Sequence, residues 1–256
     1  MRYQASPALV KAPRALLCIH GAGCSPAIFR VQLSKLRAAL RENFEFVYVT
    51  APFPSSAGPG ILPVFADLGP YYSWFESSSD NNHNGPSVSE RLAAVHDPIR
   101  RTIVDWQTQH PHIPIVGAIG FSEGALVTTL LLWQQQMGHL PWLPRMSVAL
   151  LICPWYQDEA SQYMRNEVMK NHDDDNDSKD TEWQEELVIR IPTLHLQGRD
   201  DFALAGSKML VARHFSPREA QVLEFAGQHQ FPNRPRDVLE VINRFRKLCV
   251  TAQTLE

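Results

Sequence analysis

Short apolar runs alternate with segments of helical periodicity along most of the chain. The apolar runs lie at residues 15–20, 44–50, 113–119, 147–153, 193–197 and 221–225. Helical patterns begin at about residue 25 and recur at 89–107, 123–137 and 237–249. Buried strands of a parallel sheet read as continuous apolar runs, and crossover helices connect them. The pattern therefore predicts an α/β fold with a mostly parallel central sheet and helices on both faces.

The first helical segment carries a clear start signal. Ser25 is suited to cap a helix, and Pro26 is suited to its first turn. Apolar residues then recur at Ile28, Val31, Leu36, Ala39 and Leu40. This spacing predicts one helix whose apolar face packs against the sheet.

Two long segments interrupt the alternation. Residues 51–86 are rich in proline, glycine and aromatic residues, and residues 157–187 are polar, with aspartates at 173–175 and 177. These aspartates lack the spacing of an EF-hand and indicate a solvated acidic loop. Long irregular insertions commonly shape a substrate pocket, so we expect both to form a small lid. No change in composition marks a boundary, and residues 1–256 are predicted to form a single domain.

Charge and cysteine content narrow the functional classes. The 256 residues include 24 Lys and Arg against 27 Asp and Glu, a net charge of -3, which argues against nucleic acid as the main partner. The four cysteines form no CxxC pair, so we expect neither a disulfide framework nor a metal site. No apolar run suits a signal peptide or a membrane span, and we expect a cytoplasmic protein with no membrane partner.

The most informative motif is G-x-S-x-G at residues 120–124. It lies directly after a predicted strand and directly before a predicted helix. The glycines allow a tight strand-to-helix turn, which raises the hydroxyl of Ser122 above the edge of the sheet. Backbone N–H groups at the start of the following helix then point toward the same place. The motif therefore indicates that Ser122 is a nucleophile.

A serine nucleophile needs a base and an acid that orients the base. Adjacent carboxylates, Asp200 and Asp201, follow the strand at 193–197. His229 lies between the strand at 221–225 and the last helix. The order Ser, Asp, His matches that of α/β hydrolases, but the residues alone leave the choice between the two aspartates open.

A set of sequence blocks in a fixed order carries a family resemblance. The blocks lie at residues 17–21, 28–32, 50–52, 69–75, 120–125, 198–201 and 227–232. Together they resemble the fungal serine hydrolase family of the α/β-hydrolase superfamily, whose members include the ovarian-cancer-associated serine hydrolase and thioesterases of fungal polyketide clusters. The block Gly-Pro-Tyr-Tyr-x-Trp-Phe at 69–75 resembles the polyketide branch in particular.

This resemblance implies an α/β-hydrolase fold and a thioesterase that releases a polyketide acyl chain from the carrier domain of a synthase in fungal secondary metabolism. A carboxylesterase or a lactone-forming enzyme acting on a free small-molecule ester is the main alternative, because the same residues perform all three reactions. A third hypothesis is a catalytically inactive binding module on the same fold. Neither a metal nor an organic cofactor is expected.

The resemblance also selects Asp201 as the acid, because the family places that residue three positions after the glycine. Ser122 would attack the acyl carbonyl, His229 would transfer the proton, and Asp201 would orient the imidazole. The backbone N–H groups of Ala22 and Glu123 are the expected donors of the oxyanion hole. His20 and Cys24 lie near this loop and are interpreted as residues that orient or pack it.

Aromatic residues cluster near the predicted site. The candidates for substrate binding are Tyr71, Tyr72, Trp74, Phe75, Trp155, Phe202 and Phe231. Their number suits a bulky acyl group. Aromatic residues are also common in protein cores, so part of the run at 71–75 is expected to anchor its loop instead.

Overall fold

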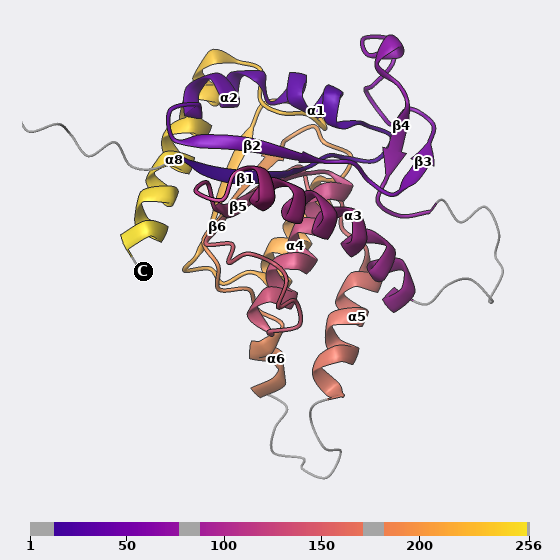
Figure 1. Cartoon of the computed structure of the whole chain (residues 1–256), viewed down its shortest axis with the longest axis vertical. Coiled ribbons are helices and arrows are strands. Elements are labelled where there is room, and N and C mark those ends of the chain that lie inside the picture. The colour runs from indigo at the N-terminus through magenta and orange to yellow at the C-terminus, as the bar shows by residue number, and fades with distance from the viewer. Residues whose placement is uncertain (1–12, 77–87, 171–181, 255–256) are drawn as a thin grey trace, which may run out of the picture.

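The computed structural model describes residues 13–76, 88–170 and 182–254, and within them six parallel strands form the central sheet (Figure 1). The strands are β1 (Arg14–Ile19), β2 (Phe44–Val49), β5 (Ile115–Phe121), β6 (Val148–Ile152), β7 (Thr193–Gly198) and β8 (Ala220–Phe225). They lie in the order β2-β1-β5-β6-β7-β8. The strand order reverses between β1 and β5, and ligands of open α/β sheets bind at the carboxyl ends of strands at such a point.

Helices cover both faces of the sheet, as the sequence pattern predicts. They are α1 (Pro26–Gln32), α2 (Ser34–Leu40), α3 (Val88–Gln109), α4 (Glu123–Gln136), α5 (Asp158–Met169), α6 (Glu182–Glu186), α7 (Leu204–His214) and α8 (Pro235–Thr254). Figure 1 shows α1, α2 and α8 on one side, with α3 and α4 on the other. The predicted α/β fold is confirmed.

The strands contribute to two apolar cores, one on each face of the sheet. Along β1, Leu17 and Ile19 belong to the core beneath α3 and α4, while Leu16 and Cys18 belong to the core beneath α1, α2 and α8. Successive side chains of a strand point to opposite faces. Because both faces are covered, both sets are apolar, which explains the continuous apolar runs in the sequence.

The first helical segment differs from its prediction. The hydroxyl of Ser25 accepts the N–H of Ile28 at 3.4 Å, so the predicted cap is present. The segment then divides into α1 and α2 at Leu33, which is buried. Ile28, Leu36 and Leu40 of the predicted apolar face are buried, but Val31 is 50% exposed. The prediction of one continuous helix was therefore wrong.

The two insertions are more regular than predicted. Within residues 51–76, β3 (Phe53–Ser55) pairs with β4 (Tyr71–Ser73) in an antiparallel sheet, and a 3-10 helix, η1 (Ala66–Leu68), lies between them. In the second insertion, α5 buries Met164 and Val168 at a spacing of four residues, which is the period of a helix face. The acidic composition concealed this period. The aspartates at 173–175 and 177 lie outside the described residues.

The cysteines Cys18, Cys24, Cys153 and Cys249 are all buried as free thiols. Among the described residues, no helix is long and apolar enough to cross a membrane. The single domain and the cytoplasmic location stay predictions.

His195 makes the stability of this sheet sensitive to acid. Its side chain is fully buried in β7, and burial lowers its pKa from 6.5 to about 3. Between these pH values the unfolded chain binds more protons than the folded chain, so stability falls as the pH is lowered through this range. Between pH 7.5 and pH 5 this effect lowers the free energy of unfolding by roughly 2 kcal/mol. We expect the His195→Leu variant to lose that much less stability over the same range.

Urea unfolding at both pH values measures this difference. His112 is exposed, and His112→Gln serves as the matched control, which should lose as much stability on acidification as the unsubstituted chain. An equal loss in the His195→Leu variant would contradict the prediction.

Candidate active site

Ser122 lies in a strained turn at the carboxyl end of β5, directly before α4. Its backbone adopts φ 54° and ψ -120°, a left-handed conformation that is uncommon for residues other than glycine. The N–H of Ser122 donates to Ile152 O at 2.9 Å, and its carbonyl accepts the N–H of Trp155 at 3.1 Å. The turn is therefore held by the segment that leaves β6.

The two glycines of the motif allow α4 to begin against the end of β1. A Cβ atom on Gly124 would lie 2.2 Å from Ile19 O and 2.3 Å from His20 O. A Cβ atom on Gly120 would lie 2.4 Å from Thr128 Oγ1. Any side chain at either position would push the helix away from the sheet, so the spacing of the motif has a steric cause.

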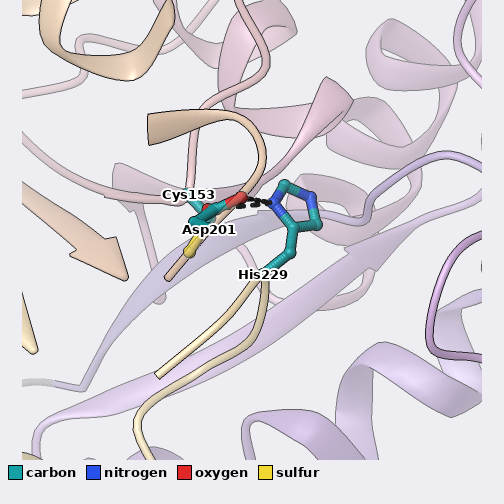
Figure 2. Close-up of side chains that lie close together, drawn as sticks. All are labelled: Cys153, Asp201 and His229. Carbon is teal, nitrogen blue, oxygen red and sulfur yellow. Dashed lines mark hydrogen bonds and ion pairs between the residues drawn. The ribbon is translucent and has the colours of Figure 1, made fainter. Parts of the chain in front are cut away.

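The structure brings Ser122, His229 and Asp201 together although they lie far apart in the sequence. The loop between β8 and α8 places His229 Nε2 2.7 Å from Ser122 Oγ. His229 Nδ1 lies 2.9 Å and 3.0 Å from the two carboxylate oxygens of Asp201, as the dashed lines in Figure 2 show. A carboxylate only accepts hydrogen bonds, so Nδ1 carries the proton and Nε2 accepts the Ser122 hydroxyl. Asp200 is exposed.

Asp201 is held in its charged form. Burial alone would raise its pKa, but hydrogen bonds from His229 and from the N–H of Ala203 lower the pKa below its ordinary value. The imidazole of His229 contacts the rings of Phe121 and Phe202, with centroid distances of 5.1 and 4.5 Å. The surrounding groups therefore fix both the charge of Asp201 and the orientation of the His229 ring.

Cys153 lies beside Asp201 and His229 (Figure 2), and these three residue types can bind a metal ion. Its Sγ, however, donates to Gln230 O at 3.6 Å, and both carboxylate oxygens of Asp201 already accept from His229. Burial and the nearby Asp201 carboxylate raise the pKa of the thiol, so it stays protonated. The donors fit a hydrogen-bonded array better than a metal site.

The two backbone donors predicted for an oxyanion hole lie beside Ser122. Within the described part of the chain, the N–H groups of Ala22 and Glu123 donate to no protein acceptor. Both residues line the same cavity as Ser122. Unpaired donors at the start of a helix and in a loop beside it can bind an anion.

A cavity of about 250 Å³ opens at Ser122 and has mainly apolar walls. Its lining residues are Gly21, Ala22, Cys24, Pro59, Ile61, Phe121, Ser122, Glu123, Trp155, Gln157, Phe202 and His229. Trp155 and Phe202 are predicted substrate residues that do reach this cavity. Pro59, Ile61 and Gln157 come from the two insertions, and no sequence signal distinguished them from their neighbours.

The other predicted aromatic residues lie elsewhere, because the core and the loops take up their side chains. Trp74 is fully buried. Tyr71 donates its hydroxyl to Ala66 O at 2.9 Å. Tyr72 and Phe75 pack against the core beneath α3 and α4, and Phe231 packs against the core on the opposite face. None of the five is among the residues that line the cavity at Ser122.

Comparison with known proteins identifies the family of this chain. The profile of the family described as serine hydrolase (FSH1) matches residues 10–241. The chain belongs to this family. The family resemblance predicted from the sequence blocks is therefore confirmed.

Known relatives match all or most of the chain. The chain is 96% identical over 256 residues, all of both sequences, to an Aspergillus terreus (strain NIH 2624 / FGSC A1156) thioesterase named for dihydromonacolin L and the lovastatin nonaketide synthase. It is 66% identical to esterase mokD of Monascus pilosus, again over the full length of both. It is 58% identical to esterase mlcF of Penicillium citrinum, over 93% of this chain and 91% of that one.

Solved structures at lower identity show the same fold. Acyl-protein thioesterase 2 of Zea mays superposes with a TM-score of 0.55 at 18% identity, over 92% of this chain and 94% of that one. A carboxylesterase of Mesorhizobium loti gives a TM-score of 0.50 at 14% identity, over 91% and 88%. The α/β-hydrolase fold that the resemblance implies is therefore present.

The close approach of α4 to β1 predicts that Gly124→Ala disturbs the site. The added methyl group would displace the turn that carries Ser122, and misplacement by about 1 Å can lower a rate by about 100-fold. Gly206→Ala is the control, because its Cβ atom would meet its nearest neighbour, Tyr156 Cβ, at 3.4 Å. Hydrolysis of a p-nitrophenyl ester by the two variants measures the effect. Equal rates would show that the contact does not hold the turn.

Proposed function

We propose that Ser122, His229 and Asp201 form the catalytic triad of this serine hydrolase. The observation that supports this most directly is the continuous hydrogen-bonded array from Ser122 Oγ through the imidazole to the Asp201 carboxylate. The array ends at a cavity large enough to admit part of an acyl group. A serine with its base at 2.7 Å, oriented by a buried acid, is equipped for acyl transfer.

In the first half of the reaction, Ser122 Oγ attacks the carbonyl carbon of an acyl ester or thioester. His229 Nε2 takes the hydroxyl proton as the bond forms, and the negative charge moves to the carbonyl oxygen. The N–H groups of Ala22 and Glu123 donate hydrogen bonds to that oxygen, and each such donor contributes about 3 kcal/mol in the transition state. When the tetrahedral intermediate breaks down, His229 returns the proton to the leaving thiol or alcohol.

In the second half, water or a substrate hydroxyl attacks the acyl group on Ser122. His229 takes the proton from the attacking group and returns it to Ser122 Oγ, which restores the enzyme. Asp201 remains ionised and stabilises the imidazolium in both halves. The triad serves hydrolysis and lactone formation equally, so the substrate and the attacking group determine the product.

We further propose that the substrate is a polyketide acyl chain that is bound to the carrier domain of a synthase as a thioester. The relative at 96% identity is named as a thioesterase and carries a polyketide synthase in its name. The apolar walls of the cavity, including Trp155 and Phe202, suit an acyl chain. Relatives named as esterases keep an oxygen ester as the alternative substrate.

The adjacent aspartates provide a matched test of the triad. We expect Asp201→Asn to lower kcat by about 10⁴-fold, because an amide beside His229 Nδ1 favours the wrong tautomer. Asp200→Asn has the same change in charge at an exposed position and should leave kcat within about twofold. Ser122→Ala should lose both turnover and labelling by a fluorophosphonate probe. Full activity of Ser122→Ala, or equal rates in the two Asn variants, would overturn the assignment.

The proposed substrate class predicts a preference between leaving groups. A polyketide acyl group presented as a carrier-domain thioester should give a kcat/KM at least tenfold above that of its matched ethyl ester. Mass spectrometry of the released product distinguishes the free acid from a lactone, and Ser122→Ala measures the uncatalysed background. Higher kcat/KM for the ethyl ester would favour the carboxylesterase alternative.

A further inference from the structure

The two N–H groups assigned to the oxyanion hole come from separate parts of the chain. Ala22 lies in the loop that leaves β1, whereas Glu123 is the first residue of α4. An oxyanion hole functions only when its donors keep a fixed separation before the charge develops. Some contact must therefore hold this loop and this helix at a fixed distance from each other.

Trp74, just beyond β4, contacts both elements. Its indole Nε1–H donates to His20 O at 2.7 Å, directly before the oxyanion loop. Its backbone N–H donates to Glu123 Oε2, also at 2.7 Å. The side chain is fully buried, so water does not compete for the bond between the indole and His20 O. One residue thus joins the two parts of the chain that supply the donors.

The residues before Trp74 fix the rest of the loop. Tyr72 and Cys24 exchange backbone hydrogen bonds of 2.8 and 3.1 Å, and the hydroxyl of Ser73 accepts the N–H of Gly23 at 3.0 Å. Ala22 lies between His20 and Gly23, which these bonds and the indole of Trp74 hold in place. Its N–H donates to no protein acceptor in the described part of the chain, so the loop is fixed while this proposed oxyanion donor stays available.

His20 completes the network from within the loop. The N–H of Ala51 donates to its Nε2 at 3.2 Å, so its Nδ1 carries a proton and donates to Gly21 O at 2.8 Å. The His20 and Trp74 rings are 5.5 Å apart. The carbonyl oxygens of His20 and Gly21 thus both accept hydrogen bonds, from Trp74 Nε1–H and His20 Nδ1–H. These bonds keep the two oxygens from turning toward a developing oxyanion.

We propose that Trp74 is a positioning residue that sets the separation of the two oxyanion donors through its bonds to His20 and Glu123. The inference rests on the triad assignment of the proposed function. Trp74 is not among the residues that line the cavity at Ser122, so it acts through His20 and Glu123. It should therefore affect the transition state more than the binding of the ground state.

Trp133 provides a matched control for the test. It is also a fully buried tryptophan, and its Nε1–H donates to a backbone carbonyl, Glu186 O, at 2.9 Å. Trp133→Phe and Trp74→Phe therefore each remove an indole and one hydrogen bond from the core. We expect Trp74→Phe to lower kcat about 10- to 100-fold with KM changed less than about threefold. Trp133→Phe should change kcat less than about twofold.

Affinity for a trifluoromethyl ketone, which forms a tetrahedral adduct with the serine, gives an independent reading. Relative to the unsubstituted chain, the inhibition constant of this ketone should rise in Trp74→Phe in proportion to the fall in kcat. In Trp133→Phe it should stay unchanged. Should Trp74→Phe fail to fold, Glu123→Ala removes the other bond and should show the same division between kcat and KM, with smaller losses in Glu123→Gln, which keeps an acceptor oxygen.

Losses of kcat no larger than in Trp133→Phe, or losses confined to KM, would overturn the role of Trp74. Ser122→Ala separates this outcome from failure of the proposed function. An inactive Ser122→Ala beside an unaffected Trp74→Phe rejects the positioning role alone, whereas an active Ser122→Ala rejects the triad itself.

Discussion

The site depends on the contact between the first turn of α4 and the end of β1. Gly124 lies so close to Ile19 O and His20 O that a single methyl group would not fit. This contact forces the chain through a left-handed backbone at Ser122, and strain of about 1–3 kcal/mol at such a residue persists only where the surrounding structure holds it. Here the end of β6 at Ile152 and the segment after it at Trp155 hold this turn. The position of Ser122 is thus a property of the packed sheet, and Ser122 lies at the point where the strand order reverses.

Much of this arrangement could be predicted from the sequence, because parallel strands buried on both faces leave a strong pattern. The six strands of the sheet, the turn at Ser122 and the order of acid and base all follow from local signals. Other features depend on tertiary packing. The break at Leu33 is one, since each half of that segment has helical periodicity by itself. The choice between Asp200 and Asp201 is another, because only the direction of the chain after β7 decides which carboxylate faces His229. Trp74 was grouped with substrate residues because an aromatic run gives no indication of which rings are buried.

The charges of the site are distributed so that few of them compete. Asp201 stays ionised beside His229, while burial lowers the pKa of His20 to about 4, so that ring is neutral at physiological pH. Burial also raises the pKa of the Glu123 carboxyl to about 7, against the hydrogen bond from the N–H of Trp74. The Glu123 side chain is thereby kept partly neutral near pH 7. This limits its repulsion of an oxyanion bound at the backbone N–H of the same residue.

The buried thiols have a consequence for an enzyme that would release a thiol product. Cys24 lines the cavity beside Ser122, and burial raises the pKa of its thiol to about 12. Since the thiolate is the reactive form, only about one such side chain in 10⁵ is ionised at pH 7. The thiol of Cys24 is therefore kept from capturing, by S-acylation, an acyl group that enters the cavity. The same protonation shields Cys24 from forming a mixed disulfide with a thiol that a thioester substrate would release.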